Sequence, residues 1–314
     1  MTSFSFFDLH CDTATELFSN RAALSQNNLA VSLTNAECFD RYAQVMAIWT
    51  DHELGDEAGW QRLCQVLQYL RADASVQNSK AKIVSDTSDP SDGASLFLAV
   101  EDARILNRKI SRLEELYQWG FRILTPLWAG ETCIGGSHDT SAGLTPFGKD
   151  ALRVALDLGM IPDVSHASLR SADQIFDLAA KKGRSVIASH SNAYEICGVS
   201  RNLHPHQIDA ILSLGGVIGL NLYCNFLSTK DNASREDVLR HVEYFLEHGC
   251  ENALCFGCDM DGADLPKDIP NLAAIPSLRE YLSRYYSEDV LTRLFYKNAY
   301  HFAERSLSPS AKNL

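Results

Sequence analysis

Short apolar runs alternate with longer amphipathic runs along this chain, and that alternation restricts the fold more than any other feature of the sequence. The apolar runs have the length and character of β-strands and lie at residues 3–10, 44–50, 95–101, 121–128, 161–166, 185–190, 216–223 and 253–259. The stretches with helical periodicity lie between them, at residues 59–70, 111–120, 145–159, 171–183, 206–216 and 234–249. Because a strand followed by a helix leads back to a parallel neighbour, the pattern predicts an α/β protein whose strands close into a (β/α)8 barrel of the TIM type.

Local signals at the helix ends support this interpretation. Thr145 followed by Pro146 is typical of an N-cap with a proline in the first turn. Ser234 with Asp237 three residues later resembles a capping box, and Gly249 follows that helix as its stop signal. These residues predict where individual helices begin and end.

An open, doubly wound sheet is the structural alternative. Such a sheet would usually carry a glycine-rich phosphate turn after its first strand, whereas this chain continues there with HCDTAT, residues 10–15. No low-complexity linker divides the sequence, so we expect a single barrel domain over residues 1–314 with a C-terminal helical extension. The long polar connection at residues 71–95 is expected to form a surface excursion.

Charge and cysteine content exclude several classes of partner. The formal net charge is −12 and the pI is about 5.3, which argues against binding to nucleic acid or to an anionic membrane surface. The nine cysteines are scattered between Cys11 and Cys258, as expected for reduced thiols, and the C-x-x-C at Cys255 and Cys258 has no second pair to make a zinc ribbon. No signal peptide or membrane-spanning run is recognisable and the C-terminal end is polar, so we expect a cytoplasmic protein.

Ionisable side chains gather at the ends of the predicted strands. The stretch FFDLHCDT puts His10 and Asp12 on one face of an extended strand, with Asp8 one step further back and Cys11 pointing the other way. The ligand-type residues at strand ends are His10, Asp12, Glu101, His166, His190 and Asp259. A single histidine at a strand end is more often structural than a ligand. A whole set of such residues at the rim where barrels carry their chemistry predicts a metal site.

The composition of this set indicates which metal and how many ions. Three histidines and three carboxylates suit a divalent cation, and zinc fits best because imidazole and carboxylate are its usual catalytic ligands. The set exceeds the three protein ligands of one open catalytic zinc, which suggests two ions about 3.5–4 Å apart sharing a carboxylate. Such a pair lowers the pKa of water to around 7 and so supplies hydroxide for hydrolysis at neutral pH.

Longer motifs resemble one known family, the membrane (renal) dipeptidases of the amidohydrolase superfamily. The motifs are DLHCD, LAVEDA, GLTPFGKDALRVALDLGMIPDVSHAS, VIASHSNAYEICGVSRNLH, GGVIGLNLY and FGCDMDG, which occur in the family's order over nearly the whole chain. The resemblance implies that His10, Asp12 and Glu101 hold one zinc ion. It implies that Glu101 also bridges to a second zinc ion held by His166 and His190.

The resemblance also assigns the remaining site residues. Asp259 is similar to the family's catalytic acid/base, which takes a proton from the bridging hydroxide and delivers it to the leaving amine. Arg201 is similar to the arginine that binds the terminal carboxylate of a dipeptide, L-D dipeptides included. Trp128 stands where much of the family has a substrate-binding histidine, and its indole can donate a hydrogen bond but carries no charge. His138 lies nearby and is a candidate to replace that histidine in part.

Two rival functions stay open at this stage. The first is another amidohydrolase-type reaction, on an N-acyl amino acid or a lactone, which the departure at Trp128 makes a real alternative. The second is a barrel that binds without catalysis, against which the complete ligand set argues. The expected partner is a small dipeptide substrate, and the family resemblance is consistent with a homodimer, for which the sequence identifies no interface.

Overall fold

Eight parallel strands form the centre of the computed structural model, which describes residues 3–87, 93–230 and 232–307. Part of the predicted surface excursion and the end of the polar C-terminal stretch therefore lie outside the described residues. The strands are β1 (Phe4–Cys11), β2 (Phe39–Trp49), β3 (Ala81–Ile83), β4 (Ala94–Glu101), β5 (Phe121–Thr125), β6 (Ile161–Pro162), β7 (Ile218–Leu220) and β8 (Leu254–Phe256).

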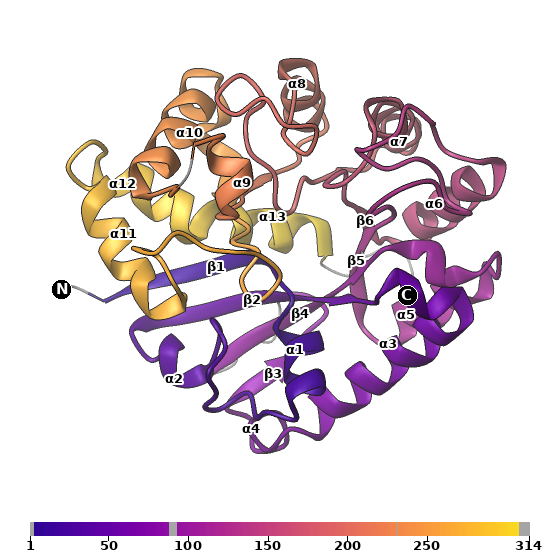
Figure 1. Cartoon of the computed structure of the whole chain (residues 1–314), viewed down its shortest axis with the longest axis horizontal. Helices are drawn as coiled ribbons and strands as arrows, with labels where there is room; N and C mark the ends of the chain where they lie inside the picture. Colours follow the sequence, from indigo (N-terminus) through magenta and orange to yellow (C-terminus); the bar gives the residue numbers. More distant parts are fainter. Residues whose placement is uncertain (1–2, 88–92, 231, 308–314) are drawn as a thin grey trace.

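The order of the strands curls the sheet on itself. Seven strands follow the path β6-β5-β4-β2-β1-β8-β7, and β3 pairs with β4 away from this path. The first strand, β1, thus pairs with both β2 and the last strand, β8 (Figure 1). Leaving β3 aside, the strands from β1 to β6 are neighbours in the sheet in their chain order, and β7 is the neighbour of β8. The path has no reversal of strand order of the kind that defines a doubly wound fold. The observed architecture is a curled parallel sheet with helices outside it.

The predicted strand at residues 185–190 is not formed as a regular strand, which corrects the expectation from the sequence. Only isolated parallel bridges occur there, between Asp163 and Ile187 on one side and between Ala188 and Ile218 on the other. The backbone of this segment instead hydrogen-bonds in part to side chains, because the Asp163 carboxylate accepts from the amide of Ser189. As assigned, the strands therefore do not by themselves make a complete eight-stranded barrel.

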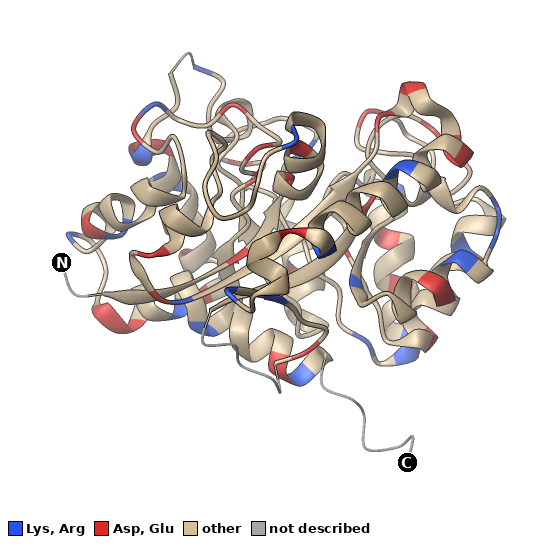
Figure 2. Ribbon diagram, turned by 90° about the horizontal axis from the view of Figure 1, so that it is seen from below, with Lys and Arg blue, Asp and Glu red and all other residues tan. Residues whose placement is uncertain are grey.

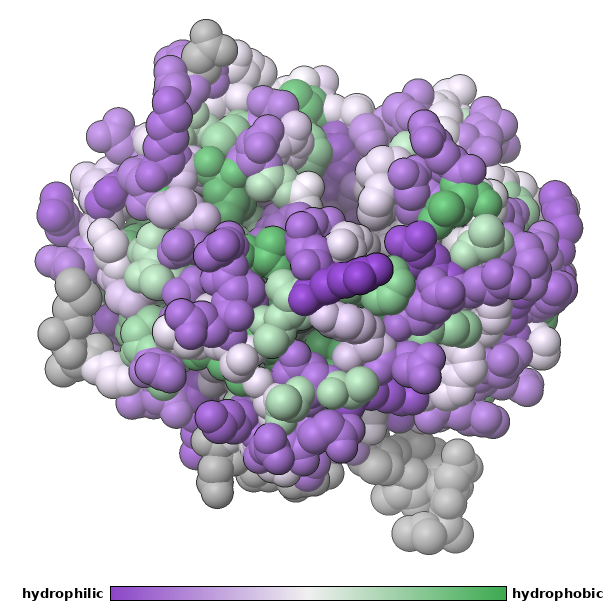
Figure 3. Space-filling view, turned by 60° about the horizontal axis from the view of Figure 1, so that its bottom comes forward, coloured by the Kyte–Doolittle hydropathy of each residue, from purple (hydrophilic) through white to green (hydrophobic). Residues whose placement is uncertain are grey.

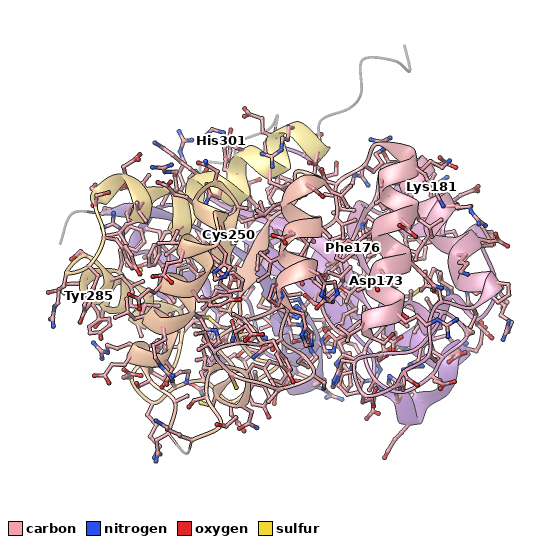
Figure 4. All side chains as sticks on the ribbon, turned by 90° about the horizontal axis from the view of Figure 1, so that it is seen from above. Asp173, Phe176, Lys181, Cys250, Tyr285 and His301 are labelled. Carbon is pink, nitrogen blue, oxygen red and sulfur yellow. The ribbon has the colours of Figure 1, made fainter. Side chains whose placement is uncertain are left out.

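Helices surround the strands in chain order, and Figure 1 shows α3, α5, α6, α7, α8 and α10 following one another around the outside. Their bounds, with those of the shorter helices, are α1 (Thr13–Asn20), α2 (Leu33–Ala36), α3 (Gly55–Ala72), α4 (Ala74–Gln77), α5 (Ser111–Gln118), α6 (Pro146–Leu158), α7 (Leu169–Lys182), α8 (Pro205–Ser213), α9 (Cys224–Leu227), α10 (Arg235–Glu247), α11 (Ile275–Leu282), α12 (Glu288–Thr292) and α13 (Asn298–Leu307). On α7, Phe176 is buried whereas Asp173 and Lys181 are exposed, as an amphipathic covering helix requires (Figure 4).

The predicted helix signals are confirmed. The Thr145 hydroxyl accepts a hydrogen bond from the amide of Gly148 at the start of α6. Ser234 and Asp237 form the capping box of α10, and Gly249 follows that helix with a left-handed φ of 76°. The polar connection at residues 71–95 contains α4 and β3, neither of which its sequence predicted.

Two apolar clusters fill the molecule on either side of the sheet. The larger one lies between the strands and the helices. The smaller one takes side chains from every strand of the path except β7, which is represented by Val217 directly before it. Ile187 also belongs to this cluster, and α13 adds Phe302 and Leu307 to it. It is the filling expected inside a barrel, which is a packed core and not a pore. On the surface, basic and acidic residues are interspersed in the view of Figure 2, and Figure 3 shows a largely hydrophilic face with scattered apolar side chains.

Candidate metal centre and substrate pocket

The predicted ligands converge at the carboxyl ends of the strands. His10 is the penultimate residue of β1 and Glu101 is the last residue of β4. His166 and Asp259 follow β6 and β8, and both have positive φ angles, 76° and 61°, which turn the chain sharply at the rim. His190 lies in the bridging segment after Ala188. All five are buried or nearly so, as is Asp12.

Three carboxylates surround the imidazole of His10. Its Nε2 atom lies 3.4 Å from Asp12 Oδ2, 3.5 Å from Glu101 Oε2 and 3.7 Å from Asp259 Oδ1. Nε2 of His10 and Oδ1 of Asp12 are buried and make no hydrogen bond to any residue that the structure describes. Buried polar atoms without partners are uncommon, so this half of the cluster has the properties of a cation site.

The other carboxylate oxygen of Glu101 faces the remaining two histidines. Glu101 Oε1 lies 3.0 Å from His166 Nε2 and 3.7 Å from His190 Nε2. The two oxygens of one carboxylate thus point to two separate groups of ligands, the arrangement of a bridging ligand. Ligand atoms of His10, Glu101 and His190, and those of His10, Asp12 and Asp259, lie close enough together to hold an ion.

The hydrogen bonds made by the Nδ1 atoms of His166 and His190 fix which nitrogen of each ring carries the proton. Nδ1 of His166 lies 3.0 Å from the carbonyl oxygen of Trp128, which can only accept, so Nδ1 is protonated. Nδ1 of His190 lies 2.7 Å from the Ser189 hydroxyl, which itself donates to Asp163 over 2.5 Å. The two unprotonated Nε2 atoms therefore face each other at 2.9 Å. Two lone pairs at that distance repel, and a cation between them and Glu101 removes the repulsion.

Burial dominates the protonation of the cluster. It raises the pKa of Glu101 and of Asp259 above the ordinary carboxyl range and holds the pKa values of His166 and His190 well below that of a free imidazole. Burial would also lower the pKa of His10, but the nearby carboxylates, Glu101 first, outweigh it and raise that pKa. A divalent cation would satisfy the negative charge that otherwise retains protons here.

The turn after β8 presents Asp259 to the other ligands. The Asn221 amide donates to Asp259 Oδ2 over 2.9 Å and so fixes the orientation of the carboxylate. Asp261 and Gly262 shape this turn. Asp261 accepts hydrogen bonds from Thr13 and from the amide of Ala30, and a Cβ atom at Gly262 would lie 2.0 Å from Asp12 Oδ2.

Arg201 lies beside this cluster in an unusual state for a guanidinium. It is only 5% exposed, and its two donors make long contacts, 3.3 Å to the carbonyl of His190 and 3.4 Å to the hydroxyl of Ser191. Within the described part of the chain its Nε makes no hydrogen bond, and the guanidinium lies 5.0 Å above the ring of Phe226. Burial lowers its pKa to about 10. Among the described residues no carboxylate lies within ion-pair distance of it.

A pocket of about 560 Å³ opens above the cluster. Aromatic side chains line it, together with predicted ligands, further acidic residues and small loop residues: Asp12, Thr15, Glu16, Trp49, Glu101, Trp128, His166, Tyr223, Phe226, Asp259, Asp261, Gly262, Ala263 and Asp264. Trp128 packs against Trp49 with ring centroids 5.0 Å apart, so it forms a wall. His138 hydrogen-bonds to the hydroxyl of Ser200, and its ring lies 6.0 Å from that of His166.

Several residues of this region were not identified from the sequence. Asn221 and Ser189 were missed because only ionisable residues were considered at strand ends. His52 lies outside the strand-end pattern, yet its Nε2 is 2.6 Å from Asp102 and its ring packs on Trp128. Asp163 accepts hydrogen bonds from the backbone amides of Ser165 and Ser189, and it connects to the ring of His190 only through the Ser189 hydroxyl.

Known structures resemble this fold closely at low sequence identity. A dipeptidase of peptidase family M19 superposes with a TM-score of 0.89 at 22% identity, over 98% of this chain and 100% of that one. A metallopeptidase of Rhodobacter sphaeroides, liganded with a phosphinate mimic of L-Ala-D-Ala, has the same TM-score and identity over 97% of this chain and 100% of its own. In addition, no helix in the described part of the chain is both long and apolar enough to traverse a bilayer.

Sequence relatives and a family model complete the comparison. An uncharacterized protein from the pqqA 5′ region of Klebsiella pneumoniae is 31% identical over 199 residues, 59% of this chain and 72% of that protein. An uncharacterized dipeptidase of Schizosaccharomyces pombe is 26% identical over 194 residues, 58% of this chain and 45% of its own length. The family model for membrane dipeptidases matches residues 1–306, and this chain therefore belongs to the membrane dipeptidase family, peptidase family M19.

Proposed function

We propose that this protein is a binuclear zinc dipeptidase that hydrolyses the peptide bond of dipeptides with a free C-terminal carboxylate, L-D dipeptides included. Membership of the metallo-dipeptidase family supports a metal-dependent hydrolase. The observation that carries the substrate class is Arg201, a buried guanidinium beside the ligand cluster with no acidic partner among the described residues. A planar carboxylate pairs with such a fork through two hydrogen bonds, and the C-terminus of a dipeptide is such a group.

The residues at the rim fit two divalent cations. Asp12, His10 and one oxygen of Glu101 would hold one, and the other oxygen of Glu101 with His166 and His190 would hold the second. Unpartnered buried ligand atoms and facing imidazole lone pairs support this assignment. Zinc in such a site supplies Lewis acidity, which polarises a carbonyl and lowers the pKa of water.

The protein's own residues account for the proton transfer. Asp259 is held by Asn221 and lies 3.7 Å from His10 Nε2, at the edge of the ligand cluster. Burial raises the pKa of Asp259, which brings a carboxyl closer to the range where it can both accept and return a proton. Asp259 would take the proton of the attacking water and deliver it to the leaving amine, while Arg201 holds the C-terminus in place.

The same pocket determines the rest of the recognition. Trp128 and Trp49 form an apolar wall, so the neutral Trp128 would contact a substrate side chain and leave oxyanion stabilisation to the metal. Another hydrolase reaction of the amidohydrolase superfamily, on an N-acyl amino acid or a lactone, is the second candidate. An N-acyl amino acid shares the free carboxylate that Arg201 would bind, and it lacks only the N-terminal amine.

Three finer features belong to the same proposal. The segment around Ile187 would complete an eight-stranded barrel, which its bridges to both neighbouring elements support. The nine free thiols are consistent with a reducing, cytoplasmic location. We also propose a homodimer that binds neither nucleic acid nor membrane, in keeping with the acidic net charge of −12.

A substrate panel tests the proposed function. Purified protein should hydrolyse L-L or L-D dipeptides, lose that activity with a chelator and regain it with zinc, and contain about two zinc ions per chain, as expected for a two-metal site. C-terminal amides and N-acyl amino acids should react poorly. Glu101→Gln should lose both metal and turnover, whereas Glu57→Gln, at a carboxylate that binds Arg112 near the surface, should keep both.

Two results would contradict this function. Preferential turnover of N-acyl amino acids or lactones would establish the alternative hydrolase. The protein could also retain no divalent metal after gentle purification and gain none on dialysis against zinc. In that case catalysis by a metal is ruled out, and the barrel would have only a binding role.

A further inference from the structure

A buried chain of hydrogen bonds leads from Asp163 to a proposed zinc ligand. Asp163 Oδ2 accepts from the Ser189 hydroxyl at 2.5 Å, and that hydroxyl lies 2.7 Å from Nδ1 of His190. All three residues are at most 1% exposed. The hydroxyl proton belongs to the bond with the carboxylate, so Ser189 Oγ accepts the Nδ1 proton of His190. The chain therefore has one direction, from imidazole through hydroxyl to carboxylate.

Asp163 is anchored independently of this chain. Its Oδ1 accepts from the amides of Ser165 and Ser189 at 2.9 Å each, and its Oδ2 also accepts from the Thr125 hydroxyl at 2.7 Å. A carboxylate with this many donors is held in place. It can therefore act as a fixed acceptor at the end of the hydrogen-bond chain from His190.

We propose that Asp163 and Ser189 are positioning residues that fix the tautomer and orientation of His190 and thereby set the affinity of the metal ion held by His166 and His190. The inference rests on the proposed metal-dependent function. Ligand imidazoles commonly donate their second N–H directly to a carboxylate or carbonyl, and losing that partner weakens metal binding roughly 10- to 100-fold. Here the Ser189 hydroxyl lies between the imidazole of His190 and the carboxylate of Asp163, so orienting the imidazole requires the serine as much as the carboxylate.

The neighbouring ligand provides an internal comparison. His166 donates its Nδ1 proton to the backbone carbonyl of Trp128, which no side-chain substitution removes. Both imidazoles therefore present Nε2 toward Glu101, but only the one of His190 depends on replaceable side chains. Disturbing Asp163 or Ser189 should weaken one of the two metal equivalents and leave the other, near His10 and Asp12, largely unchanged.

Zinc titration of metal-free protein, in competition with a chromophoric chelator, tests this inference without any measurement of turnover. Ser189→Ala should raise the dissociation constant of one equivalent roughly 10- to 100-fold. Ser189→Thr restores a hydroxyl and should return close to wild type. Thr125→Val is the matched control, since it removes a hydrogen bond of similar length from the same Asp163 oxygen but leaves the chain to His190 intact.

The outcomes separate positioning from simple structural support. Asp163→Asn should weaken zinc binding at least as much as Ser189→Ala, and if it fails to fold, the serine variants still decide. If Ser189→Ala binds zinc like wild type, or if Thr125→Val loses as much affinity as Ser189→Ala, the inference is wrong while the metal site stands. If wild-type protein binds no zinc, both this inference and the proposed function fail.

Discussion

Replacing Arg201 with methionine should raise the stability of the substrate-free protein and strongly lower its catalytic efficiency on dipeptides. Burial lowers the pKa of Arg201 from its usual 12.5 to about 10, which corresponds to roughly 3 kcal/mol of penalty on the charged form. The cation–π contact with Phe226, about 1 kcal/mol, and two long hydrogen bonds offset part of it. Removing the charge should therefore raise the free energy of unfolding by about 1–2 kcal/mol, or a few degrees in Tm.

The effect on catalysis should have the opposite sign. A buried ion pair that loses one partner typically costs about 3–5 kcal/mol, so kcat/KM for a dipeptide should fall roughly 100- to 1,000-fold or more, mainly through KM. The same substitution should abolish the preference for a dipeptide over its C-terminal amide, because the group that distinguishes the two substrates is gone. Urea unfolding in parallel with steady-state kinetics on both substrates measures the two effects.

A second arginine gives the matched control for this experiment. Arg112 is as buried as Arg201, but it donates to Glu57 and to the carbonyl of Ile105 at 2.6 Å each and lies on the ring of Trp60. Arg112→Met should therefore destabilise the protein, since it breaks satisfied interactions. If Arg201→Met destabilises as much as Arg112→Met, or if it keeps the preference for a free carboxylate, the reasoning about Arg201 is refuted.

Four further outcomes follow from the same geometry. Gly262→Ala places a Cβ atom 2.0 Å from Asp12 Oδ2 and should reduce bound metal and lower kcat about 100-fold, as shown by metal analysis and kinetics. Asn221→Ala removes the hydrogen bond to Asp259 and should lower kcat roughly 10- to 100-fold with little change in KM. Burial raises the pKa of Asp8 from 3.8 to about 6, so the folded state binds a proton more tightly than the unfolded state does. The free energy of unfolding should therefore fall as the pH rises between those two values. Asp8→Asn should remove this pH dependence in urea unfolding and should be more stable than wild type at pH 7 by up to roughly 3 kcal/mol. Chelation of the metal should lower Tm, and zinc at 100 times its dissociation constant should restore about 2.7 kcal/mol per site in calorimetry.

The periodicity of the sequence predicted the order and type of most elements, and two of its failures have physical causes. β3 has only three residues in a polar segment, and it is a strand because it pairs with β4 and not because of its own pattern. The run at residues 185–190 reads as a strand, but at its end Ser189 and His190 are held by side chains of neighbouring elements. A hydrophobic pattern does not predict where backbone amides leave the hydrogen bonding of a sheet and donate to polar side chains instead.

Searching for ionisable residues at the ends of predicted strands identified the predicted ligands correctly as one group, because the carboxyl ends of parallel strands lie at one rim. It missed Asn221 because amide side chains were not counted, although this residue directly follows β7. It missed His52 because that residue lies in a helical turn after β2, and its contact with Asp102 depends on a positive φ of 74° at the aspartate. When the contact of one residue depends on an unusual backbone conformation at a residue far away in the sequence, the local sequence around either residue does not predict it.

The rim also shows how a functional cluster differs from a structural polar network. Asp163 makes four hydrogen bonds and is fully satisfied, as a buried carboxylate in a stable core should be. Arg201, by contrast, has no acidic partner among the residues that the structure describes. The imidazoles of His166 and His190 face each other through lone pairs, and His166 and Asp259 have positive φ angles. Each feature costs about 1–3 kcal/mol, against a total stability of about 5–15 kcal/mol, so several at one place need an explanation beyond folding. Bound ligands would resolve all of them together: cations between the imidazoles and carboxylates and, under the proposed function, a substrate carboxylate on the guanidinium.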